Sequence, residues 1–133
     1  MKSFASDNNS GVHSSVLDAI LRANQGHAIG YGDDPWTKEA EELFKLNFGN
    51  QCETYFVFNG TGSNIISLQL ITRPYNSIIC AETAHINVDE CGAPVKSTGC
   101  PVIPVPVSNG KLTPELIMPF LHGFGIEHHS QPG

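Results

Sequence analysis

The sequence predicts an α/β fold built on a mostly parallel sheet that is flanked by helices. Helical patterns alternate with short apolar runs, the clearest of which are residues 55–58 and 77–80. Strands that are apolar on both faces are typical of parallel sheets with helices covering each side. The length of 133 residues and the apolar content of 40% fit one domain, or part of one, with a packed core.

The N-terminal residues predict an extended polar segment followed by a helix. Residues 1–10 lack the apolar stretch of a secretory signal, so we expect a cytoplasmic protein. Either Ser14 or Ser15 can cap the helix, because a serine hydroxyl accepts a hydrogen bond from a free N–H of the first turn. The helix should end at residues 24–26. Its apolar face carries Val16, Leu17, Ile20 and Leu21.

A glycine-rich, acidic loop over residues 26–35 predicts an irregular connection to a second helix. Glycines favour such loops because they reach backbone angles that other residues avoid. The second helix should start at Trp36, with Asp34 or Thr37 as its cap, and stop at residues 48–50. Its buried stripe is expected to contain Ala40, Leu43, Phe44 and Phe48.

The middle of the chain predicts two buried strands separated by a helix. The apolar, aromatic run 55–58 is the first strand, and it leads through loop 59–64 into a helix over residues 65–71. This helix is apolar on most faces, so we expect it to be well buried. It should end at residues 73–74, an Arg-Pro pair, before the second strand at residues 77–80.

The C-terminal part predicts a third strand between two helical segments. Residues 82–90 are polar and can contain a short helix. Residues 102–107 predict a strand at an edge or an extended segment, because Pro101, Pro104 and Pro106 cannot donate ladder hydrogen bonds. After a turn at residues 109–110, Thr113 followed by proline predicts the start of a helix over residues 116–121.

Composition argues against nucleic-acid binding and against a membrane span. The net charge is −6, and the seven lysine and arginine residues are scattered along the chain. A duplex-binding surface needs clustered cations that displace counterions from phosphates. No apolar run approaches the roughly 20 residues that cross a bilayer.

The cysteines predict free thiols. None of Cys52, Cys80, Cys91 and Cys100 forms a C-x-x-C pair, and without a secretion signal disulfides are disfavoured. We interpret them as small buried apolar residues. A zinc site built from Cys80, His85, Cys91 and Cys100 is disfavoured, since structural zinc sites usually bring their ligands in closely spaced pairs, and we expect no metal.

The sharpest motif is the loop at residues 59–64, which joins an apolar run to a helix. A helix N-terminus offers unpaired N–H groups and the positive end of the dipole, so it attracts anions. Gly60 and Gly62 allow close backbone approach, and Thr61 and Ser63 add hydroxyl donors. The loop is therefore either a phosphate cradle or simply a tight turn with a capping side chain. It matches neither the nucleoside-triphosphate loop nor the dinucleotide fingerprint.

A second candidate is His85, which follows a predicted strand by a few residues. The carboxyl ends of parallel strands meet at one sheet edge, where ligands bind, and the loop at residues 59–64 should lie on the same edge. An imidazole there can stack on a flat ring or move protons near neutral pH. A solvated or structural histidine is the alternative.

Two further clusters remain open. Asp33 and Asp34 form a carboxylate pair for acid–base work or a divalent ion, or else Asp34 only caps the following helix and Asp33 is solvated. His128 and His129 are adjacent and project differently from an extended strand, so they make a poor pair of ligands.

Four segments, in order along essentially the whole chain, resemble the threonine aldolase and β-eliminating lyase family. They are residues 4–8 (FASDN), 31–35 (YGDDP), 59–64 (NGTGSN) and 84–85 (AH). Members of this family are pyridoxal-phosphate enzymes with an aspartate-aminotransferase-like fold. The resemblance implies that residues 1–133 are the N-terminal part of the large cofactor-binding domain, including an N-terminal arm over residues 1–35.

The resemblance also implies roles for individual residues. The loop that holds the cofactor phosphate would contain Gly60, Thr61 and Gly62. His85 would stack on the pyridine ring and assist proton transfer, and His128 is similar to a second active-site histidine. Ser6 would lie near the substrate carboxylate, and Tyr31 near an active site at the interface of a homo-oligomer, a dimer or tetramer. The reaction implied is cleavage of L-threonine or L-allo-threonine to glycine and acetaldehyde.

The sequence also departs from the family pattern. The lysine that carries the cofactor, the aspartate that pairs with the pyridine nitrogen and the arginine that binds substrate are expected beyond this chain. None of Lys2, Lys38, Lys45, Lys96 and Lys111 stands in the context of that lysine. We therefore expect this chain to be inactive alone. The alternative is a non-catalytic phosphate-binding or interaction domain.

Overall fold

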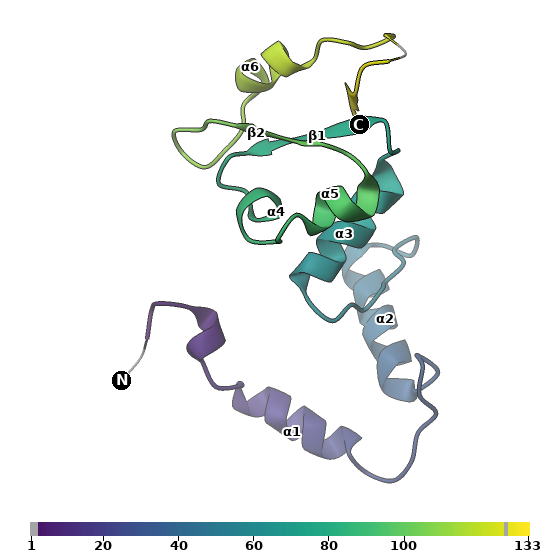
Figure 1. Cartoon of the computed structure of the whole chain (residues 1–133). Coiled ribbons are helices and arrows are strands. Elements are labelled where there is room, and N and C mark those ends of the chain that lie inside the picture. The colour runs from purple at the N-terminus through teal and green to yellow at the C-terminus, as the bar shows by residue number, and fades with distance from the viewer. Residues whose placement is uncertain (1–2, 127) are drawn as a thin grey trace. The chain divides into compact units, whose positions relative to one another are not determined.

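The computed structural model describes residues 3–126 and 128–133, and it divides the chain into two compact units, Met1–Tyr55 and Phe56–Gly133 (Figure 1). In chain order the elements are η1 (Asp7–Asn9), α1 (Ser14–Ala23), α2 (Pro35–Phe48), α3 (Gly60–Ile71), β1 (Asn76–Ala81), α4 (His85–Val88), α5 (Ala93–Thr98), β2 (Val102–Val105), α6 (Pro114–Ile117), η2 (Met118–Phe120) and β3 (Gln131–Pro132).

The first unit contains the two helices predicted there, with one correction to a cap. His13, and neither Ser14 nor Ser15, caps α1, because its Nδ1 accepts a hydrogen bond from the backbone N–H of Ser15 at 3.2 Å. Asn24 ends the helix as expected. The preceding segment is not wholly extended, since η1 forms one short 3-10 turn within it.

Asp34 is the cap of α2, and Pro35 occupies its first turn. The Asp34 carboxylate accepts hydrogen bonds from the backbone N–H of Thr37 at 2.8 Å and from the Thr37 hydroxyl at 2.7 Å. The structural interpretation of Asp34 is therefore confirmed, while Asp33 is exposed. Phe44 and Phe48, both on the predicted stripe, stack with ring centroids 5.8 Å apart.

A three-stranded parallel sheet, in the order β2-β1-β3, organises the second unit. The predicted parallel α/β class is confirmed, and so is the edge position of the proline-rich strand β2. Cys80 lies opposite Pro104, which pairs in the ladder without donating an N–H. The short strand β3 pairs only with the start of β1, where Asn76 faces Gln131.

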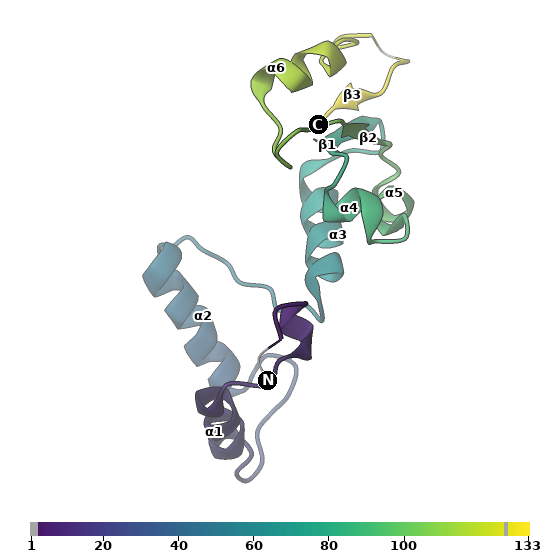
Figure 2. The same ribbon diagram turned by 90° about the vertical axis from the view of Figure 1, so that its left-hand side faces the viewer.

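Helices α3, α4 and α5 lie on one side of this sheet, and α6 lies on the other side in both views (Figures 1 and 2). Helices α3 and α5 pack against each other, and the Gln69 side chain donates to the carbonyl oxygen of Ser97 at 3.0 Å. Thr113 caps α6 as predicted. Helix α5 was not predicted from the sequence; its six residues are flanked by two left-handed glycines, Gly92 and Gly99.

The core of the second unit is small and surrounds β1. Its buried apolar residues are Ile78, Cys80, Ala81, Cys100 and Val105. Thr98 is buried among them with its hydroxyl satisfied, because Oγ1 donates to the carbonyl of Pro94 at 2.7 Å and accepts from the N–H of Cys100 at 3.0 Å. All four cysteines carry free thiols, but only Cys80 and Cys100 are buried as expected, whereas Cys91 is exposed. Burial raises the pKa of the Cys80 thiol.

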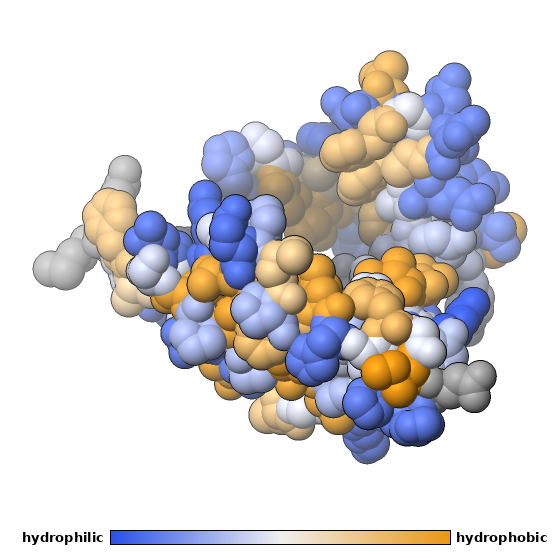
Figure 3. Space-filling model, turned by 90° about the horizontal axis from the view of Figure 1, so that it is seen from above, coloured by the Kyte–Doolittle hydropathy of each residue, from blue (hydrophilic) through white to orange (hydrophobic). Residues whose placement is uncertain are grey.

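Two expectations about the middle of the chain are wrong. Residues 55–58 form no strand, because no described strand supplies a partner for their ladder hydrogen bonds, and their aromatic side chains are exposed. Helix α3 is not well buried: Leu70 is 74% exposed, because α5 is the main neighbour along the helix in the described chain. Apolar side chains at the surface are orange in Figure 3. None of the described helices combines the length and the hydropathy needed to cross a membrane.

The Asp34 cap should make the start of α2 sensitive to acid. Hydrogen bonds from the Thr37 hydroxyl and backbone N–H lower the pKa of Asp34 below its ordinary value of 3.8. The stabilisation is therefore complete above pH 3.8 and is lost as the pH falls through the lower folded-state pKa. We expect the Thr37 amide resonance in NMR spectra to shift over that window, and helicity to decrease in Asp34→Ala at pH 7.

The neighbouring exposed carboxylate provides the control for this measurement. Asp33→Ala should leave both the Thr37 resonance and the helicity unchanged. Equal losses in the two variants would show that the helix depends on general acidity of the loop and not on the cap.

Candidate functional site

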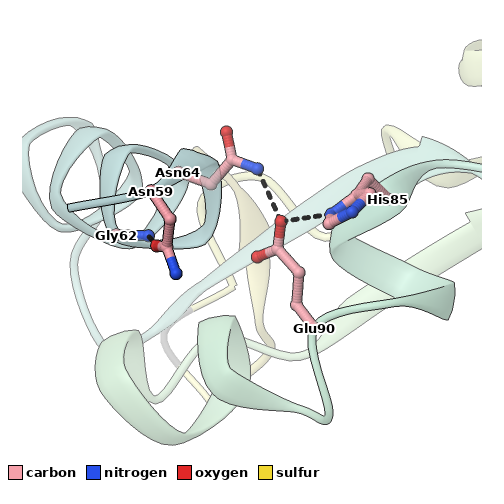
Figure 4. A network of polar contacts seen from close by, with 5 residues as sticks. All are labelled: Asn59, Gly62, Asn64, His85 and Glu90. Carbon is pink, nitrogen blue, oxygen red and sulfur yellow. Dashed lines mark hydrogen bonds and ion pairs between the residues drawn. The ribbon is translucent and has the colours of Figure 1, made fainter. Parts of the chain in front are cut away.

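The loop predicted to hold an anion forms the cap and first turn of α3. Asn59 is in extended conformation, and its side-chain oxygen accepts a hydrogen bond from the backbone N–H of Gly62 at 2.9 Å (Figure 4). Within the described chain, the backbone N–H groups of Gly60 and Thr61 have no hydrogen-bond acceptor. These two donors therefore remain available at the positive end of the helix dipole.

The two glycines of this turn have different surroundings. A Cβ atom added to Gly60 would meet nothing within 4 Å, so the space beside its Cα atom is open. A Cβ atom added to Gly62 would lie 3.4 Å from the Asn59 side-chain oxygen that forms the cap. Gly60 therefore leaves room for a ligand, whereas the lack of a side chain at Gly62 leaves room for the cap.

His85 lies at the start of α4, just beyond the carboxyl end of β1. Its Nδ1 atom is 2.7 Å from Oε1 of Glu90, and the same oxygen accepts a hydrogen bond from the Asn64 amide nitrogen at 2.6 Å. Figure 4 shows Glu90 reaching up between Asn64 of α3 and His85. The structure thus brings together two predicted features, the N-terminal turns of α3 and His85, through one carboxylate.

Burial differs sharply across this network. The Glu90 side chain has no exposed surface, while the His85 side chain is 61% exposed. The second carboxylate oxygen of Glu90 is buried and has no hydrogen-bond partner among the described residues. The arrangement presents an imidazole to solvent from a buried acidic anchor, which suits ring stacking or proton exchange at its outer nitrogen.

His128 is not brought to His85. Strand β3 is parallel to β1 and begins opposite Asn76, the first residue of β1, and His128 precedes β3 by three residues. It therefore lies near the amino end of β1, whereas His85 follows the carboxyl end. His128 and His129 are exposed and make an edge-on ring contact with centroids 5.7 Å apart.

Ser6 and the 31–35 loop belong to the first unit. The Ser6 hydroxyl oxygen accepts a hydrogen bond from the N–H of Asn8 at 3.2 Å. Tyr31 is fully exposed and has a positive φ of 64°, a conformation that is uncommon for a residue with a side chain.

Glu90 had no predicted role in the site, and Asn64 had none beyond its place in the loop at residues 59–64. Histidines at active sites are commonly oriented by a carboxylate, so an acidic residue five positions after His85 was an available signal. Asn64 gave no such signal, because its contact spans 26 residues of sequence. Over the residues that the structure describes, no group of three or more His, Cys, Asp or Glu side chains is placed to bind a metal ion.

Known proteins are similar to this chain in sequence and in fold. A family model described as beta-eliminating lyase matches residues 3–133. The low specificity L-threonine aldolase of Pseudomonas aeruginosa is 45% identical over 115 residues, covering 86% of this chain and 33% of that protein. The Saccharomyces cerevisiae protein of the same name is 33% identical over 97 residues, covering 71% of this chain and 24% of that protein.

The fold agrees with these matches. A solved threonine aldolase structure from Leishmania major superposes with a TM-score of 0.82 at 32% identity, covering 93% of this chain and 36% of that chain. The chain thus spans about a third or less of the length of these relatives. The family model extends over both units described above, and the chain belongs to the β-eliminating lyase family.

Proposed function

We propose that this chain supplies part of the active site of a pyridoxal-phosphate-dependent lyase of the threonine aldolase type. The observation that carries the proposal is the network in which Glu90 joins His85 to the N-terminal turns of α3. It supports a site with a phosphate-binding helix end and an exposed imidazole beside it. The relatives named low specificity L-threonine aldolase support the substrate class, a β-hydroxy amino acid such as L-threonine or L-allo-threonine.

The residues present fit the cofactor's phosphate. A phosphate dianion needs several hydrogen-bond donors, and the first turn of α3 offers the free N–H groups of Gly60 and Thr61 together with the Thr61 hydroxyl. Open space over Gly60 allows the anion to approach. Gly62 does not offer its own N–H to the phosphate, because that group donates to the Asn59 side chain. It contributes indirectly, since its lack of a side chain leaves room for this cap.

The protein residues then have distinct tasks. When bound, pyridoxal phosphate takes up the electron pair released as the Cα–Cβ bond of the substrate breaks. The exposed ring of His85 stacks on a flat cofactor and accepts the proton of the substrate β-hydroxyl group. Ser6 binds near the substrate carboxylate. A second active-site histidine at His128 stays a prediction, and in this structure the residue lies near the amino end of β1.

Replacing Thr61 should separate phosphate binding from folding. Thr61→Val removes the hydroxyl while keeping the side-chain shape, and Thr61→Ser keeps the hydroxyl. Loss of one hydrogen bond to a charged group costs about 1.5–3 kcal/mol, roughly a 10- to 100-fold weaker binding. We expect that loss only in Thr61→Val, measured by calorimetry with 4′-deoxypyridoxine 5′-phosphate, an analogue that lacks the aldehyde and so does not react with lysines. Unchanged affinity in Thr61→Val would contradict the phosphate role.

The 133-residue chain should not cleave threonine by itself. None of its five lysines stands in the context of the family's cofactor lysine, so we expect borohydride reduction with pyridoxal phosphate to label several lysines weakly. Mass spectrometry locates the labels, and the Pseudomonas aeruginosa aldolase serves as positive control. Stoichiometric labelling of one lysine together with turnover of threonine would show that the chain is a complete enzyme.

We further propose that the protein is cytoplasmic and acts as a homo-oligomer. Exposed apolar residues in both units, including Leu21, Phe48, Phe58 and Leu70, support association, because large exposed apolar patches usually mark interfaces. Light scattering should therefore show a mass that increases with protein concentration. A constant monomer mass with a cooperative thermal transition would instead favour the autonomous, non-catalytic phosphate-binding domain.

A further inference from the structure

Helix α4 alone restrains the His85 side chain weakly. The helix has four residues, and Ala84 at its start provides no side-chain cap. More than half of the His85 side-chain surface is exposed, so packing contributes little to its orientation. The strongest contact that holds the ring is its 2.7 Å hydrogen bond with Glu90.

The donor and acceptor pattern around Glu90 selects one form of the His85 ring. Oε1 of Glu90 already accepts a hydrogen bond from the Asn64 amide, so this oxygen acts as an acceptor. A carboxylate has no proton to donate, and its partner on the ring must therefore be an N–H. In neutral His85 the proton then resides on Nδ1, which leaves a lone pair on Nε2.

Burial strengthens this selection. The Glu90 carboxylate lies away from water, and its other oxygen has no partner in the described chain. Hydrogen bonds to a charged acceptor are strong, and they are stronger where water is excluded. Within the described chain, Glu90 therefore meets its hydrogen-bond partners through Oε1, which contacts Asn64 of α3 and His85 of α4.

We infer that Glu90 is a positioning residue of the site, which holds His85 in its Nδ1–H tautomer and ties it to the N-terminal half of α3 through Asn64. The inference deepens the proposed function, on which its catalytic meaning rests. With Nδ1 engaged by Glu90, Nε2 is the nitrogen free to accept the β-hydroxyl proton of the substrate. The bond to Asn64 keeps that nitrogen at a set spacing from the phosphate-binding turn.

The tautomer can be measured directly in the 133-residue chain without cofactor. Long-range ¹⁵N–¹H NMR distinguishes a protonated ring nitrogen from an unprotonated one, and His85→Asn identifies the His85 signals among the six histidines. At a pH where the ring is neutral we expect Nδ1 protonated and Nε2 unprotonated. His13 provides the opposite reference, because its Nδ1 accepts a hydrogen bond from Ser15. An Nε2–H tautomer for His85 in the unmodified chain would overturn the inference.

Variants then test whether Glu90 causes this preference. A carboxamide can donate as well as accept, so Glu90→Gln permits both tautomers, and we expect their ratio to move about tenfold toward Nε2–H, which corresponds to roughly 1.4 kcal/mol. Asn64→Ala removes only the link to α3 and should leave the tautomer intact. Glu82→Gln is the matched control, since Glu82 is an exposed glutamate eight residues earlier whose carboxylate contacts the N–H of Val107. An unchanged tautomer in Glu90→Gln would also overturn the inference.

A second readout separates this inference from the proposed function. We expect 4′-deoxypyridoxine 5′-phosphate to bind several-fold more weakly to Asn64→Ala, because the ring and the phosphate turn lose their common anchor. If the analogue fails to bind the unmodified chain while the tautomer follows Glu90, the proposed function fails and the positioning role stands. If the analogue binds equally to Asn64→Ala and the unmodified chain, the link to α3 is refuted.

Discussion

One oxygen atom of Glu90 joins parts of the chain that the sheet alone would leave independent. Helix α3 precedes β1 and α4 follows it, and the described contact between their polar side chains passes through this buried carboxylate. A buried charge is tolerated only when hydrogen-bonded, so the contact constrains both donors. This constraint holds the N-terminal turns of α3 and the exposed imidazole of α4 in one hydrogen-bond network.

The site also depends on a division of tasks within the first turn of α3. Asn59 uses one N–H to start the helix and leaves the two preceding N–H groups without a protein acceptor. In the proposed site, stability of the turn and binding of the phosphate therefore rely on different donors. A similar separation holds at His85, where Nδ1 contacts Glu90 while 61% of the side chain is exposed.

Local chemistry explains what was predictable from the sequence. Asp34 and Thr113 each cap a helix, because their side-chain oxygens accept a hydrogen bond from the N–H three residues later. Nearby residues therefore suffice to predict those boundaries. Residues 55–58 have the composition of a strand, but a strand requires a partner that no short segment encodes. The same limit hid the contact between Asn64 and Glu90, because these residues lie 26 positions apart in the sequence.

The prolines in and just after β2 influence on which side of the sheet another strand can be added. The backbone N–H and C=O groups of one strand residue point to the same side of the strand, and those of the next residue point to the other side. The carbonyls of Pro101 and Val105 face β1, where they accept from Ile78 and Glu82, so residues 104 and 106 face outward. Both are proline, and neither offers an N–H to an incoming strand. Of the outward-facing residues only Val102 keeps an N–H, so strand addition beyond β2 is disfavoured, and the opposite side of the sheet, where β3 covers only the start of β1, is the more open one.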